Sequence, residues 1–74
     1  MVTVKVRLQT TGELVTRIPV SLAFDADRST TKRVLTDPLG EACFAVPTGP
    51  GTIRVNGVVH YHGALSGQIV VQTS

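Results

Sequence analysis

Hydrophobic and polar residues alternate along several short stretches of this chain. Residues 2–8 place Val or Leu at every second position and polar residues between them, which is typical of a β-strand with one buried face. Residues 18–24 repeat this pattern. Pro19 cannot donate a ladder hydrogen bond, so it suits the start or the edge of a strand. The two stretches predict the first two strands.

The rest of the chain predicts four or five further strands. Residues 30–36 have a mixed pattern, which favours an edge strand. Residues 42–46 are apolar or small on both faces, which favours a central strand. Residues 52–56 and 58–62 form either two strands or one bent strand, and residues 68–73 form the last one.

Two turns punctuate the middle of the chain. Asp37-Pro38-Leu39-Gly40 suits a type I turn, because Asp can bond the backbone of its own turn, Pro fixes φ and Gly fits the fourth position. Residues 47–51, which contain two Pro and two Gly, predict a second turn. Short strands between turns at near-regular spacing, with no helical pattern, predict an all-β sandwich or small barrel.

The order of three segments is informative. These are Ile18-Pro19-Val20, then Thr36-Asp37 followed by Gly40 and Ala42-Cys43-Phe44, and finally Pro47-Thr48-Gly49. Over roughly residues 2 to 57, this order resembles the immunoglobulin-like prealbumin fold of carboxypeptidase-regulatory-like and Cna B-type domains. The resemblance implies a small immunoglobulin-like β-sandwich of six or seven short antiparallel strands, with residues 1–74 as a single domain. It says little about function, because such sandwiches serve as stalks, adhesins, carbohydrate-binding modules and assembly proteins.

Many Cna B-type domains carry an isopeptide bond between Lys and Asn, promoted by a buried acid. The resemblance implies Lys5 as the amine and Glu41 as the acid. Residues 68–73 carry no Asn or Asp, however, and Lys5 lies on the polar side of its strand. We therefore do not expect this bond.

Composition points to a small domain that needs outside help with stability. Val and Thr are abundant, whereas the 74 residues include only two Phe, one Tyr and no Trp. A chain of this length buries about 60% of its unfolded surface, which leaves a thin stability margin. The single Cys excludes an internal disulfide, and no zinc-finger spacing is present. Oligomerisation, or docking onto a larger assembly, is the leading source of additional stability.

Charge and the first residues restrict the partners. Seven basic and five acidic residues give a formal charge of +2, and most of the basic residues are scattered, so we expect a solvated surface and no nucleic-acid partner. No signal-peptide pattern follows Met1, and no apolar run is long enough to span a bilayer. If Met1 is the native start, we expect an intracellular protein or part of a particle assembled inside a cell.

Few residues suggest chemistry. His60 and His62 lie two apart on a predicted strand, so they could share a metal if a symmetry axis supplied further ligands. Two surface histidines, or a pH-sensitive contact, are the alternatives. Asp25 and Asp27 suit a solvated loop better than a calcium site. Cys43 has apolar neighbours and is predicted to be a buried, inert thiol.

We therefore predict a non-enzymatic structural protein that needs no cofactor and acts through its surfaces in a larger assembly, such as a virion decoration, a filament or a surface array. The patterns of the terminal strands suit pairing with a protein partner or a second copy by β-augmentation. The predicted contact residues are Val58, Val59, Tyr61, Leu65 and Ile69. The alternative is a ligand-binding module, most plausibly for glycan, in which Tyr61 would be the aromatic platform. An enzyme is the least favoured class.

Overall fold

Seven strands, and no helix, make up the part of the chain described by the computed structural model, which comprises residues 1–26 and 29–73. The strands are β1 (Val2–Leu8), β2 (Pro19–Phe24), β3 (Val34–Leu35), β4 (Glu41–Phe44), β5 (Gly49–Val55), β6 (Val58–Leu65) and β7 (Gly67–Thr73). The predicted all-β class is confirmed. Within the described residues, no helix has the length and apolar character needed to cross a membrane.

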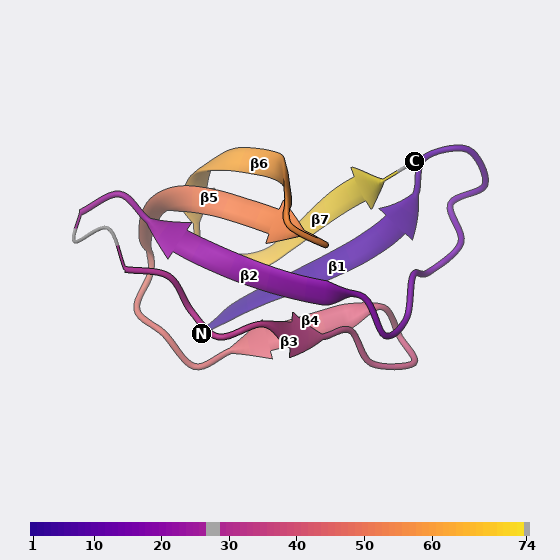
Figure 1. Cartoon of the computed structure of the whole chain (residues 1–74), viewed down its shortest axis with the longest axis horizontal. Coiled ribbons are helices and arrows are strands. Elements are labelled where there is room, and N and C mark those ends of the chain that lie inside the picture. Colours follow the sequence, from indigo (N-terminus) through magenta and orange to yellow (C-terminus); the bar gives the residue numbers. More distant parts are fainter. Residues whose placement is uncertain (27–28, 74) are drawn as a thin grey trace.

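The strands form two sheets that stack into a small β-sandwich (Figure 1). One sheet has the order β4-β1-β7 and the other the order β3-β2-β5-β6. At one side of the sandwich β6 contacts β7, and at the opposite side β3 contacts β4. No ladder joins the two sheets, so β4, β7, β3 and β6 are edge strands.

One pairing differs from the antiparallel arrangement that we expected. β1 and β7 run parallel and in register over their whole length, from Val2 opposite Gly67 to Leu8 opposite Thr73. The other pairings, β1–β4, β2–β3, β2–β5 and β5–β6, are antiparallel. The first and last strands thus lie side by side, which no local pattern in the sequence indicates.

The core lies between the sheets and consists mainly of aliphatic side chains. The residues that alternate on β1 and β2 supply much of it, as the sequence predicts. The buried apolar residues are Val2, Val4, Val6, Val20, Leu22, Ala42, Phe44, Ile53, Val55, Leu65 and Val71. Complete burial of a Val or Leu side chain contributes about 1.5–3 kcal/mol, so these residues are the main source of stability.

The predicted turn at residues 37–40 is confirmed. Gly40 N donates to Asp37 O at 2.8 Å, and the Asp37 carboxylate accepts from Leu39 N at 2.9 Å and from Glu41 N at 3.0 Å. Gly40 has a φ of +74°, and a Cβ there would lie 3.0 Å from Val6 O. This position therefore requires glycine, since its backbone is left-handed and lies close to β1.

Several strand boundaries differ from the sequence predictions. Within residues 30–36, only Val34–Leu35 is a strand. Leu22 N of β2 donates to the side chain of Thr31, at 2.9 Å from Oγ1, so a side-chain bond replaces a backbone ladder bond at this point. β4 is an edge strand, so the predicted central position of residues 42–46 is wrong. Residues 49–51 belong to β5, and β6 continues to Leu65, where we expected a turn and a loop.

Candidate functional site

The side of the sandwich where β6 meets β7 carries the residues that we predicted to make contacts. Val58 and Val59 are exposed, at 58% and 54% of their surface, whereas Tyr61 and Ile69 are partly buried against the core. Leu65 is fully buried. Its predicted role as a contact residue is therefore wrong, because it packs inside the sandwich.

β6 begins in a tight hairpin. The two turn residues, Asn56 and Gly57, have φ values of 53° and 82°. Asn and Gly are the residues that tolerate such left-handed positions, and this pair is the strongest short hairpin signal in a sequence. Residues 52–56 and 58–62 therefore belong to two strands, which resolves the alternatives left by the sequence.

A β-bulge sits in β6 next to this hairpin. Arg54 lies opposite Val59 and Ile53 lies opposite Tyr61, so His60 is the additional residue. The bulge changes the alternation. Val59 lies opposite the exposed Arg54, on the outer face, whereas Tyr61 lies opposite the buried Ile53, on the core face. Val58 is opposite Val55, so it also belongs to the core face although it is exposed.

Three residues on the core faces of these two edge strands therefore remain partly or largely accessible, namely Val58, Tyr61 and Ile69. We call this group the β6–β7 side. It marks the margin where the two sheets do not cover each other completely, since the β6 and β7 edges share contacts but no ladder. The margin therefore leaves apolar side chains of both edge strands in contact with water.

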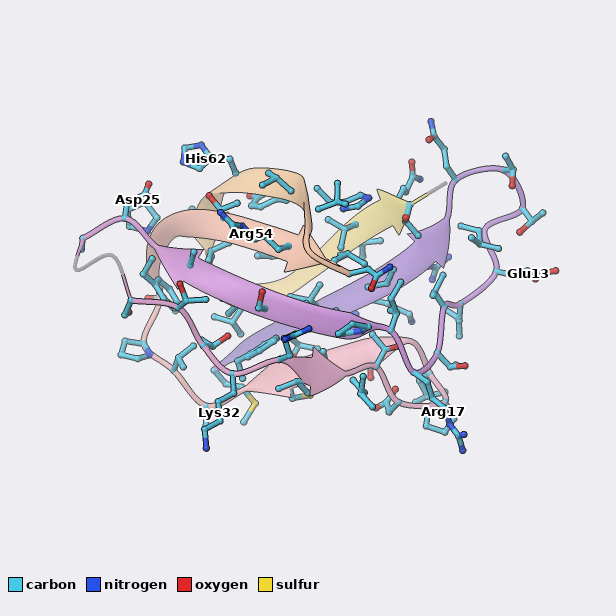
Figure 2. The ribbon with its side chains drawn as sticks, in the orientation of Figure 1. Glu13, Arg17, Asp25, Lys32, Arg54 and His62 are labelled. Atoms are coloured by element: carbon cyan, nitrogen blue, oxygen red, sulfur yellow. The ribbon has the colours of Figure 1, made fainter. Side chains whose placement is uncertain are left out.

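The two histidines do not converge on each other. His60 Nδ1 lies 2.9 Å from Val58 O and therefore donates to that carbonyl. His62 Nε2 lies 3.3 Å from Asp25 Oδ2, and both side chains are more than half exposed; Figure 2 shows His62 and Asp25 beside each other at the surface. Residues 1–26 and 29–73 contain no group of three metal-ligating side chains. Asp27 lies outside the described residues. Metal binding by His60 and His62 at a symmetry axis stays a prediction.

Tyr61 is held in place by its own strand. Its hydroxyl donates to Ala64 O at 3.2 Å, and its ring lies over Gly63, where a Cβ would be 3.1 Å from the hydroxyl oxygen. Phe44 is buried, whereas Phe24 and Tyr61 are partly exposed. Glycan binding on Tyr61 stays a prediction, with one face of a partly exposed ring as its platform.

β7 is one of the terminal strands that we predicted to pair with another chain, and it lies at an edge of its sheet. Val71 is buried and Ile69 is partly buried, whereas Gln68, Val70 and Gln72 are exposed on the outer face. Val70 is 52% exposed. The alternation of residues 68–73 contains this information, because Ile69 and Val71 share one face and leave Val70 alone on the other. β7 contains no charged residue and no proline.

The prediction that Cys43 is buried is wrong, because Cys43 lies on the outer face of the β4-β1-β7 sheet. Cys43 is exposed, not buried, and lies 3.7 Å from Thr3 Oγ1. Lys5 lies on the same face, opposite Glu41 of β4. The Nε atom of Arg7 is buried there without a hydrogen-bond partner in the described structure.

The described surface also has open hollows, two of which have a distinct lining. One, of about 260 Å³, lies among Phe24, Val46, Pro47 and Pro50, and the described residues that line it include no titratable group. The other, of about 350 Å³, includes Lys32, Arg33 and Arg54. In Figure 2, Lys32 and Arg54 project in different directions, so their charges do not converge on one point.

Comparison of the chain with known protein families, curated proteins and solved structures finds no match. The function must therefore be inferred from the geometry of the β6–β7 side and of the strand edges.

Proposed function

We propose that this protein is a non-enzymatic assembly subunit that acts through its surfaces, with other protein chains or further copies as its partners. A virion decoration, a filament and a surface array are the kinds of assembly that such a subunit suits. The observation that carries the proposal is the open edge of β7, a seven-residue strand without charge or proline. Soluble proteins usually protect long edge strands with charges, prolines or bulges, and β7 has none of these.

The β6–β7 side supports the same proposal. Val58 is exposed although it belongs to the core face of its strand, and it lies on the same side of the sandwich as the open edge. A partner that covered such a side would remove apolar surface from water, at about 25 cal/mol per Å². The chain has one cysteine and therefore no internal disulfide, so association is a physically reasonable source of additional stability.

We also propose that the sandwich is of the immunoglobulin-like prealbumin type. The turn at residues 37–40 supports this, because it leads into a strand whose Ala42 and Phe44 both face the core. The isopeptide bond found in some relatives of that type has no support in this chain, since Lys5 and Glu41 lie on the outer face.

The test is the oligomeric state in solution. Light scattering from about 1 to 500 µM, with and without a chelator, should report a mass that exceeds the monomer and increases with concentration. The melting temperature should increase over the same range, because partners bind only the folded state. A stable monomer whose melting does not depend on concentration would contradict the proposal. A chelator-sensitive oligomer would show that a metal ion holds the copies together, with His60 and His62 as the candidate ligands.

A further inference from the structure

The hydrogen-bonding groups at the free edge of β7 belong to every second residue. Gln9 N donates to Thr73 O at 2.8 Å, so the carbonyl of Thr73 points towards β1. The N–H and C=O of one residue point to the same side of a strand, and successive residues alternate. Gln68, Val70 and Gln72 therefore direct both backbone groups away from β1. Figure 1 shows no strand beside the C-terminal half of β7 on that side.

The sequence of β7 is nearly symmetric about Val70. Residues 68–72 read Gln-Ile-Val-Val-Gln. If an antiparallel copy places its Val70 opposite Val70, then Gln68 lies opposite Gln72 of the copy and Ile69 lies opposite Val71. Every pair then joins similar side chains, which is favourable for both the apolar and the amide positions.

The direction of the free backbone groups and the symmetry of the β7 sequence favour the same register. With Val70 opposite its copy, the three residues that carry free backbone groups meet one another, so that Gln68, Val70 and Gln72 each donate one hydrogen bond and accept one. A shift of one residue would bring outward-pointing groups opposite inward-pointing ones and would lose these bonds.

From this agreement, which rests on the proposed assembly function, we propose that the occupant of the β7 edge is a second copy of this chain. The two copies pair antiparallel about a two-fold axis through the Val70 pair. They form one continuous sheet of order β4-β1-β7-β7-β1-β4. Such an isologous contact closes on itself and gives a dimer.

Charge favours this edge for self-pairing. Like charges oppose each other in an isologous contact wherever a charged residue lies near the axis, and β7 contains none. The nearest charge on the neighbouring strand is Lys5, which lies opposite Val70. Its counterpart would be three strand spacings away, about 14 Å, which exceeds the Debye length of about 8 Å at physiological salt.

The other three edges are less suitable among the described strands. β3 has two residues and follows Lys32 and Arg33, and β4 has four residues and carries Glu41. β6 contains the bulge at His60, which interrupts a regular ladder. The two-fold axis at β7 also brings the β6–β7 side of each copy towards the other copy, where exposed Val58 would find cover.

Strand pairing over seven residues buries a small interface, so we expect a dimer with a Kd of about 1–100 µM. The test uses the full chain and sedimentation equilibrium. Val70→Lys places two ammonium groups beside the axis and should weaken the dimer about 30-fold or more. The matched control is Leu35→Lys, which introduces the same charge at a similarly exposed aliphatic residue on β3, at the opposite side of the sandwich, and should alter the Kd less than about 3-fold. Both positions are exposed, so both variants should keep the wild-type melting temperature at low concentration.

A second measurement tests the register. In the Cys43→Ser background, Val70→Cys places two thiols on residues whose Cα atoms are about 5.5 Å apart, within the range of a disulfide. Gln68→Cys places them about 14 Å apart, because its opposite residue is Gln72. We expect Val70→Cys to form the oxidised dimer at least about 10-fold faster.

The outcomes separate the two proposals. An oligomer that Val70→Lys leaves intact, or equal crosslinking at positions 68 and 70, would overturn the β7 pairing while the assembly function stands. A wild-type chain that remains monomeric up to about 500 µM would overturn both.

Discussion

Among residues 1–26 and 29–73, Thr36 is the buried polar residue, and its hydroxyl joins two segments. It is 3% exposed and follows β3 directly. The hydroxyl donates to Val15 O at 2.8 Å and accepts from Ile18 N at 3.1 Å. The Thr36 backbone adds two bonds, because its N–H donates to Ile18 O at 3.1 Å and its C=O accepts from Arg17 N at 2.9 Å. One residue therefore fixes the connection that leads into β2.

Thr36→Val keeps the shape of the side chain but removes the hydroxyl. It leaves Val15 O and Ile18 N without their side-chain partner in a partly buried site. Each unsatisfied buried group costs about 1–3 kcal/mol, and the added methyl group returns a fraction of this. We expect a net loss of about 2 kcal/mol in the free energy of unfolding, which corresponds to a decrease of about 8–16 °C in Tm for a domain of this size.

Urea denaturation at about 1 µM chain, in the Val70→Lys background that weakens the dimer, measures this loss with little contribution from association. Thr36→Ser keeps the hydroxyl and should cost less than Thr36→Val, although it removes more atoms. Thr10→Val is the control at an exposed threonine and should change the free energy by less than about 0.5 kcal/mol. If Thr36→Val also stays below about 0.5 kcal/mol, or if Thr36→Ser is the more harmful variant, the hydroxyl does not hold the connection.

Two further predictions follow from close packing and from exposure. Gly51→Ala should lower the free energy of unfolding in urea by about 2–3 kcal/mol, because a Cβ there would contact Ala23 O and lie 2.8 Å from Leu65 Cδ1. Gly57→Ala is the comparison variant: a Cβ there meets nothing within 4 Å, so its cost reports only the backbone strain of φ 82°. Cys43 should react with a thiol reagent in the native state within about 10-fold of the unfolded rate, because it is exposed, and a native chain that resists modification until it unfolds would contradict this.

The parts of the fold that depend on local chemistry are readable in the sequence. The alternation in β1 and β2 predicts which residues are buried, because a one-residue change of register would turn every side chain to the other face. The turn at residues 37–40 is predictable as well, since Asp37, Pro38 and Gly40 each have a separate conformational reason to occupy their positions.

The errors arise where local pattern is insufficient. The small side chains around Cys43 do not distinguish a core face from an outer face, so a strand at the sheet edge had the pattern of a central one. In β6 the bulge at His60 changes the alternation, and the strand continues through Gly63 to bring Leu65 into the core. The parallel pairing of β1 with β7 joins the two ends of the chain, and no turn between them records it.

The thin stability margin and the open edge are connected by mass action. A partner that binds only the folded chain stabilises it by about 2.7 kcal/mol when its concentration is 100 times the Kd. This gain is comparable with the stability expected to be lost in Thr36→Val. Thr36 follows β3 in one sheet, whereas Val70 lies on β7 in the other sheet. The two effects should therefore add. Concentrated Thr36→Val should regain much of the stability of the dilute wild type, whereas the Thr36→Val, Val70→Lys double variant should not, because its edge no longer accepts a copy.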